Sequence, residues 1–245
     1  MRLSVIVPTL NEAQALAATL ARARVACLGA EIIVADGGSG DATCAIAHAA
    51  GGTRVLDAPR GRGRQQNAGA RAARGDVLLF LHADTHLPEG AGDAVQRALE
   101  NGCVLGGNFR LAFDPPDPLN RLFARVYNHR ARHHRHYYGD SVLFVRRSVF
   151  EEMGGFREGM LMEDWEFVRR LEARCRTSRE FGDFVPPLGD RGERTVWLPL
   201  TVTTSARRFA GRRRWRYLYL WAYLHYLHAR GVSGDRLAEM YPDVR

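Results

Sequence analysis

The sequence contains no lysine, and all 35 of its Lys or Arg positions are arginine. Against 27 acidic residues this gives a formal net charge of +8 at pH 7. A basic balance is compatible with nucleic acid, anionic lipid or phosphorylated small molecules as partners, and charge alone does not choose among them. The planar guanidinium of arginine suits phosphate oxygens. Genomic base composition is an alternative explanation for the absence of lysine. The absence therefore excludes none of the three kinds of partner.

Cysteine is also scarce, and the four cysteines form no C-x-x-C pair: Cys27, Cys44, Cys103 and Cys175. This scatter argues against a disulfide framework and against a structural zinc site. The first apolar run, residues 3–7, is too short for a signal peptide, and no stretch reaches the roughly 18 apolar residues of a membrane span. These absences favour a cytoplasmic protein.

The composition is otherwise that of an average globular protein, with 46% hydrophobic and 25% charged residues. A chain of 245 residues suits one large domain, or one domain with an appended segment. The segment 212–228 is rich in Trp, Tyr and Leu and predicts a helix, with a shorter helix near 235–241. We therefore expect one domain over residues 1–210 and a helical extension over 211–245.

Short apolar strands alternate with helical segments over the first hundred residues. The expected strands are 3–7, 31–35, 53–56 and 77–81, and the expected helices are 13–26, 42–50 and 65–73. Near-continuous apolar strands that alternate with helices are typical of a parallel α/β sheet covered on both faces. Beyond residue 100 we expect strands at 103–113, 141–145 and 197–203 and helices at 119–134 and 148–153.

Polar residues follow three of these strands, at residues 8–12, 36–39 and 82–84. Because ligands of open parallel sheets bind outside the carboxyl ends of the strands, these ends predict a site. Asp84 could hold Mg²⁺ or Mn²⁺ if substrate phosphates supply further ligands, or it could cap a turn. The segment 61–67 precedes a helix and suits a pyrophosphate, or it is a solvated basic loop. It matches neither a P-loop nor a dinucleotide-binding motif.

Taken in order, these residues resemble the family 2 glycosyltransferases of the GT-A fold. The matching stretches are Val7-Pro8-Thr9-Leu10-Asn11-Glu12, Val34-Ala35-Asp36-Gly37-Gly38-Ser39-Gly40-Asp41, Leu81-His82-Ala83-Asp84-Thr85, Gly154-Gly155-Phe156 and Met162-Glu163-Asp164-Trp165. A narrower resemblance is to a bacterial subgroup labelled arsenosugar-biosynthesis-type glycosyltransferases. It rests on Gly61–Ala70, Tyr138-Gly139-Asp140, Thr204–Arg208 and Gly231–Arg245.

The resemblance implies an α/β fold of the GT-A, Rossmann-like type, with a mostly parallel sheet flanked by helices. It also implies transfer of a sugar from a nucleotide-diphosphate donor, with UDP expected, to the hydroxyl of an acceptor that the sequence does not identify. Transfer would invert the anomeric carbon in a single displacement. Mg²⁺ or Mn²⁺ would be the cofactor, because a cation stabilises the departing pyrophosphate.

The resemblance also assigns roles by position. The residues implied to bind the nucleotide-sugar are Pro8, Thr9, Asn11, Glu12, Asp36, Gly38, Arg64, Asn67, His82 and Ala83. Asp84 matches the metal-binding acid, whereas His82 stands where the family has the first Asp of its D-x-D motif. Asp164 matches the catalytic base, and Glu163, Trp165, Gly139 and Asp140 would lie around the acceptor. An alternative is that Asp164 only caps a helix over 165–172.

Several basic segments leave other interpretations open. The His- and Arg-rich stretch 129–136 could face an acceptor or anion, or it could be a solvated face. Arg207-Arg208 and residues 212–214 could bind nucleic acid, although no known nucleic-acid motif supports that, so no nucleic-acid partner is expected. A catalytically silent nucleotide-sugar-binding protein and a basic nucleic-acid-binding module are the alternative functions. The helix 212–228 is too short to span a bilayer, so it packs on the domain or lies on an anionic membrane surface.

Overall fold

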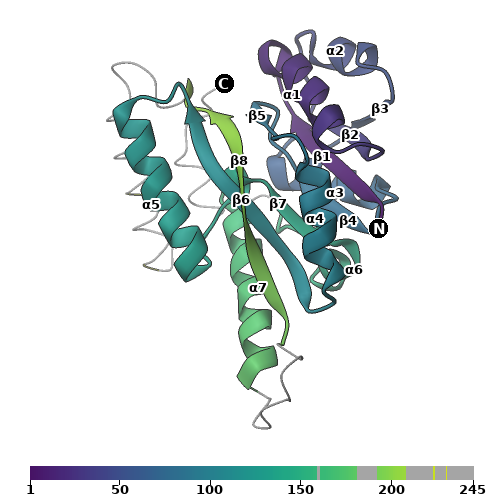
Figure 1. Cartoon of the computed structure of the whole chain (residues 1–245). Coiled ribbons are helices and arrows are strands. Elements are labelled where there is room, and N and C mark those ends of the chain that lie inside the picture. Colours follow the sequence, from purple (N-terminus) through teal and green to yellow (C-terminus); the bar gives the residue numbers. More distant parts are fainter. Residues whose placement is uncertain (159–160, 181–191, 208–222, 224–229, 231–245) are drawn as a thin grey trace.

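The computed structural model describes residues 1–158, 161–180, 192–207, 223 and 230 (Figure 1). The helices predicted at 212–228 and 235–241, and the proposed domain boundary at 210/211, lie outside these residues. In chain order the elements are β1 (Leu3–Thr9), α1 (Ala13–Ala26), β2 (Glu31–Asp36), α2 (Thr43–Ala49), β3 (Thr53–Asp57), α3 (Arg62–Ala72), β4 (Val77–Phe80), β5 (Thr85–His86), α4 (Ala91–Glu100), β6 (Val104–Asp114), α5 (Pro118–His134), the 3-10 turn η1 (Gly139–Ser141), β7 (Leu143–Arg146), α6 (Arg147–Glu152), α7 (Glu163–Glu180) and β8 (Arg194–Ser205).

The strands of the described residues form one sheet in the order β3-β2-β1-β4-β7-β6-β8-β5. Strands β3, β2, β1 and β4 are parallel to one another, as predicted. The other half is mixed: β7 is antiparallel to both β4 and β6, β8 is parallel to β6, and β5 is antiparallel to β8. The long strands β6 and β8 run side by side in Figure 1. The predicted α/β sheet flanked by helices is therefore confirmed.

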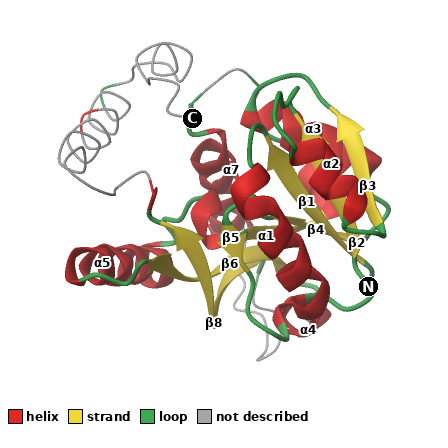
Figure 2. Ribbon diagram, turned by 90° about the horizontal axis from the view of Figure 1, so that it is seen from above, coloured by secondary structure: helices red, strands yellow, loops and turns green. Residues whose placement is uncertain are grey.

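Alternation along β1 divides the interior into two cores. Val5 and Val7 belong to the core that includes side chains of α1 and α4, whereas Ile6 belongs to the core that includes α3 and α7 (Figure 2). Successive side chains of a strand point to opposite faces, so a strand covered on both faces must be apolar throughout. Burying each of these side chains contributes about 1.5–3 kcal/mol.

The two helices next to the predicted loops differ from expectation at their starts. Helix α3 begins at Arg62 rather than at residue 65, because Gly61 precedes it with φ +129, a conformation that favours glycine. Helix α5 begins at Pro118, and Asp117 caps it by accepting a hydrogen bond of 2.9 Å from the Asn120 N–H. Proline suits this first helical position because its missing N–H would have no partner there in any case.

Two elements of the structure were not predicted, and a third was predicted only in part. Strand β5 and helix α4 were not expected, and α7 extends over 163–180 instead of 165–172. No helix within the described ranges is long and apolar enough to cross a bilayer.

Candidate active site

Hydrogen bonds fasten the loop after β1 to the loop after β2. The Asn11 N–H donates to Ser39 Oγ at 2.8 Å, and the Gly40 N–H donates to Asn11 Oδ1 at 2.9 Å. Asn11 has φ +55, which asparagine tolerates better than most residues. Pro8 lies half-buried in β1 opposite Ala35, and Asn11 is exposed at the rim. The two strand ends thus form one connected edge, as predicted for a ligand site.

Asp36 holds this edge together through hydrogen bonds to the end of β1 and to the loop after β2. Its carboxylate accepts hydrogen bonds from the hydroxyls of Thr9 (2.9 Å) and Ser39 (2.6 Å) and from the N–H groups of Gly38 (3.0 Å) and Ser39 (2.7 Å). Burial alone would raise the pKa of Asp36, but these bonds outweigh it and lower the pKa. Asp36 and Thr9 are both buried, whereas Gly38 is exposed with φ +87. These hydrogen bonds give Asp36 and Thr9 a loop-holding role, and their expected contact with the donor stays a prediction.

Gln65 is a site-supporting residue that the sequence analysis missed. Its side-chain amide donates to the carbonyls of Thr9 (2.5 Å) and Ala35 (3.1 Å), and it is buried. A Cβ on Gly37 would lie 3.0 Å from this amide, so the loop after β2 passes close to α3. The run of two glutamines at 65–66 was the only signal in the sequence.

Two residues expected to contact the donor instead have protein partners. The Asn67 side chain donates to the Phe156 carbonyl at 2.8 Å and accepts from the Phe156 N–H at 3.0 Å, which ties α3 to the loop 154–156. Ala83 is buried in the core, and its carbonyl accepts the Thr19 hydroxyl at 2.7 Å. Because both side chains are accounted for within the protein, the geometry does not favour donor contacts for either.

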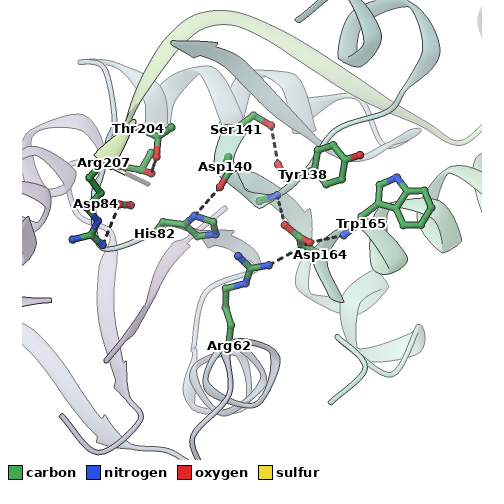
Figure 3. Close-up of polar contacts among 12 residues, drawn as sticks. Arg62, His82, Asp84, Tyr138, Asp140, Ser141, Asp164, Trp165, Thr204 and Arg207 are labelled. Carbon is green, nitrogen blue, oxygen red and sulfur yellow. Dashed lines mark hydrogen bonds and ion pairs between the residues drawn. The ribbon is translucent and has the colours of Figure 1, made fainter. Parts of the chain in front are cut away.

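His82 and Asp164 both face the middle of the site (Figure 3). His82 Nδ1 lies 3.2 Å from Asp140 Oδ1, and no partner for the buried Nε2 is found among the described residues. A Cβ added to Gly139 would lie 3.0 Å from both His82 Nε2 and Asp164 Oδ2. The histidine and the carboxylate therefore both border the space that Gly139 leaves free of a side chain.

Asp164 is held by two backbone N–H groups and one guanidinium (Figure 3). Gly139 N–H donates to Oδ2 at 2.7 Å, Trp165 N–H donates to Oδ1 at 2.8 Å, and Arg62 Nη2 lies 3.5 Å from Oδ1. Helix α7 begins at Glu163, so Asp164 lies inside its first turn rather than at the N-cap. Its side chain is 6% exposed. The predicted base is thus oriented by groups from three separate segments.

Arg62, rather than Arg64, is the arginine that reaches this carboxylate. It also forms an ion pair with Glu163, whose side chain is 4% exposed. Burial would lower the pKa of Arg62, but attraction to Glu163 and Asp164 raises it well above its ordinary value. Arg64 is about half exposed and lies 3.6 Å from Glu158. Both arginines follow a glycine in the sequence. Which of them points toward Asp164 depends on the residue at which α3 begins.

Aromatic side chains continue the site beyond Asp164. The Trp165 indole N–H lies 2.9 Å from His136 Nε2, and Arg130 Nη2 and the Tyr138 hydroxyl lie 3.0 and 2.9 Å from the same nitrogen. Since indole and guanidinium groups only donate, His136 Nε2 is an acceptor and the ring is neutral. Arg169 lies over the Trp165 ring. His136 and Arg130, from the stretch 129–136, thus face the site.

The remaining histidines of that stretch lie elsewhere. His129, His133 and His134 are exposed on α5, with ring centroids of His129 and His133 4.7 Å apart. Within the described ranges no three metal-binding side chains form a cluster that could hold an ion. The stretch therefore divides into a site-facing end and an exposed face.

Asp84 and Glu12 meet at the guanidinium of Arg207. Arg207 Nη2 lies 2.6 and 2.8 Å from the two Glu12 carboxylate oxygens and 3.2 Å from Asp84 Oδ2. Carboxylate oxygens are ligands that Mg²⁺ and Mn²⁺ accept, and one or two suffice when phosphates supply the rest. The donor set at Asp84 therefore fits the cation that the resemblance implies, provided that Arg207 moves.

Residues 4–154 match the model of glycosyl transferase family 2, and the chain belongs to this family. The family match ends before Asp164, so the role of that residue stays a prediction. Among curated relatives are PGL/p-HBAD biosynthesis glycosyltransferases of Mycobacterium tuberculosis and Mycobacterium bovis, 34% identical over 186 residues that cover 67% of this chain and 67% of theirs. The narrower arsenosugar-type resemblance stays a prediction.

Solved structures show the same fold. The mannosyltransferase PcManGT from Pyrobaculum calidifontis, in complex with GDP-Man and Mn²⁺, aligns with a TM-score of 0.63 at 18% identity, over 94% of this chain and 64% of that one. S. aureus TarS in complex with UDP-GlcNAc aligns with a TM-score of 0.55 at 17% identity, over 69% and 52%. This chain spans less than two thirds of either solved chain. The GT-A fold expected from the sequence is confirmed.

Proposed function

We propose that this chain transfers a sugar from a UDP-sugar to an acceptor hydroxyl by a single inverting displacement, with Asp164 as the base. The observation that carries the proposal is that Asp164 Oδ2 and His82 Nε2 both border the small space beside Gly139, at the edge built by β1, β2 and β4. A donor bound along that edge would have the base on the opposite side of its reacting carbon. Displacement from that side inverts the carbon.

On the acceptor side, Asp164 would receive the proton of the attacking hydroxyl. The bonds from the Gly139 and Trp165 N–H groups fix the plane of its carboxylate, leaving the remaining lone pairs for that proton. The ion pair with Arg62 helps to hold the carboxylate in this position. Trp165, His136 and Tyr138 would form the wall on which the acceptor rests, and the neutral His136 fixes the indole.

On the donor side, the residues proposed to line the nucleotide-sugar are those exposed or half-exposed at the edge: Pro8, Asn11, Glu12, Gly38, Arg64, His82 and Asp140. The N-terminus of α3 points its free N–H groups toward negative charge, as helix N-termini do. A divalent cation at Asp84, Mg²⁺ or Mn²⁺, would supply positive charge to the departing diphosphate.

Titration calorimetry with UDP and GDP, each with and without Mn²⁺, tests the donor half of the proposal. Both bases are needed because the aligned mannosyltransferase structure contains GDP-Man and the TarS structure contains UDP-GlcNAc. We expect UDP to bind more tightly than GDP, and Mn²⁺ to strengthen the binding. Failure of both nucleotides under every condition would contradict the proposal. Binding without transfer or hydrolysis of any UDP-sugar would favour the silent binding protein.

A further inference from the structure

Backbone contacts fix the place where Arg207 meets Asp84. Strand β8 pairs with β5, the Ser205 N–H donates to the Asp84 carbonyl at 3.2 Å, and the hydroxyls of Thr85 and Thr204 lie 2.8 Å apart (Figure 3). Arg207 follows this strand by two residues. The pairing of β8 with β5 therefore places the Arg207 backbone, and with it the guanidinium, beside the donor edge.

Three carboxylate oxygens surround one nitrogen at this point. Both Glu12 oxygens and one Asp84 oxygen lie within 3.2 Å of Arg207 Nη2, and each acid has a side chain only 16% exposed. Small divalent cations take one or two protein carboxylates together with substrate phosphates. The carboxylate oxygens that bind the guanidinium could therefore also be the protein ligands of a divalent cation. The same oxygens cannot bind the guanidinium and the metal ion at the same time.

We propose that Glu12 completes the divalent-cation site with Asp84, and that Arg207 competes with the cation for both carboxylates. This rests on the proposed function, which brings a nucleotide diphosphate to the same edge. A cation that enters alone must deprive Arg207 of its two anionic partners. A diphosphate that arrives with the cation offers the guanidinium new anionic oxygens. Cation and nucleotide therefore bind cooperatively, with Arg207 as the residue that couples them.

Binding of Mn²⁺, followed by the paramagnetic resonance signal of the free ion, tests this without any turnover. In nucleotide-free protein we expect Arg207→Gln to tighten Mn²⁺ binding by about tenfold, the size of one charged hydrogen bond. The factor by which UDP strengthens Mn²⁺ binding should shrink in the same variant. Arg110→Gln, at an exposed position of β6, is the matched loss of charge and should change neither quantity.

Glu12→Gln, made alone and with Arg207→Gln, tests the second ligand. It should cancel the gain that Arg207→Gln produces, because the cation then has only Asp84. An unchanged or weaker Mn²⁺ affinity in Arg207→Gln overturns the competition, and a gain that survives Glu12→Gln overturns the role of Glu12. If the wild type binds no nucleotide at any Mn²⁺ concentration, the proposed function fails, while the nucleotide-free comparison still decides the competition. Melting temperatures exclude misfolded variants.

Discussion

Arg62 Nη2 lies 3.5 Å from Asp164 Oδ1, while Arg62 Nε pairs with Glu163, so one guanidinium serves two adjacent buried acids. Without that cation, two negative side chains would face each other with little solvent to screen them. Attraction to both acids raises the pKa of Arg62 well above its ordinary value, which keeps a positive charge beside them. Arg62 is therefore a positioning residue for the proposed base.

Replacing Asp164 by Asn should stop transfer while leaving donor binding within a few-fold of the wild type. The amide keeps the size of the side chain but accepts no proton, and loss of a positioned base lowers turnover by about 10²–10⁴-fold. Turnover, donor affinity and melting temperature check this together. A small loss of stability is expected, because the amide nitrogen must face one of the two N–H groups that Asp164 now accepts. A fully active variant would show that another group is the base.

Arg62→Gln should lower turnover by about tenfold or more while donor affinity stays within a few-fold of the wild type. The guanidinium fixes the position of the proposed base, and a small displacement of a reacting group is costly in rate. We also expect a stability loss of about 1–3 kcal/mol, since the buried partners lose a charged hydrogen bond. Turnover, donor affinity and urea unfolding measure these effects, with Arg147→Gln as the matched control, because Arg147 has a similar side-chain exposure, 34% against 31%, and pairs with Glu151 on α6. Turnover in Arg62→Gln equal to that of the control would contradict the role given to Arg62.

Gly139→Ala should impair turnover far more than Gly102→Ala. The new methyl group at 139 would lie 3.0 Å from Asp164 Oδ2 and from His82 Nε2, whereas nothing lies within 4 Å at 102. Displacing a reacting group by a fraction of an ångström can cost about tenfold or more in rate. Single-turnover rates and melting curves of both variants measure this. Equal rates would mean that the close approach at Gly139 has no catalytic consequence.

Glu172→Gln should change the pH dependence of stability. Burial raises the pKa of Glu172, although hydrogen bonds from Thr195 and Tyr137 oppose this. A carboxyl whose folded pKa is raised stabilises the protein below its unfolded value, and this contribution is lost as pH rises through the folded value. The free energy of unfolding of the wild type, relative to the variant, should therefore fall as the pH rises from about 4.5 through the raised folded value.

Urea unfolding across that range measures the effect, with Glu151→Gln as the control for removing one exposed carboxylate. The same pH trend in both variants would contradict the assignment to Glu172.

Strand positions and their polar ends were predictable because they depend on local composition. The apolar runs of β1, β2 and β4 have no other stable place than a sheet covered on both faces. The family resemblance assigned roles to Asp84 and Asp164, and those roles stay predictions. Long-range pairing was not predictable in the same way: β8 lies beside β6 although 90 residues separate their starts (104 and 194), and no local pattern records that register.

The supporting residues of the site were missed for a related reason. Whether Arg62 or Arg64 points inward depends on where α3 begins, and that depends on the positive φ of Gly61. Asn67 reads as a phosphate ligand in a Gly- and Arg-rich loop, but folding places the Phe156 backbone against it. Side chains that hold a site and side chains that touch a ligand are of the same types, so only the tertiary contacts separate them.

Two sets of ion pairs, one around Arg62 and one around Arg207, connect the first half of the chain to the second. Arg62 comes from the first half and pairs with Glu163 and Asp164 of the second, whereas Arg207 comes from the second half and pairs with Glu12 and Asp84 of the first. A chimaera that keeps the donor-side half and exchanges the acceptor-side half would have to preserve both sets of partners. We therefore expect such an exchange to yield a folded enzyme only when the other relative carries both sets of ion pairs. Overall sequence identity would matter less than these two sets.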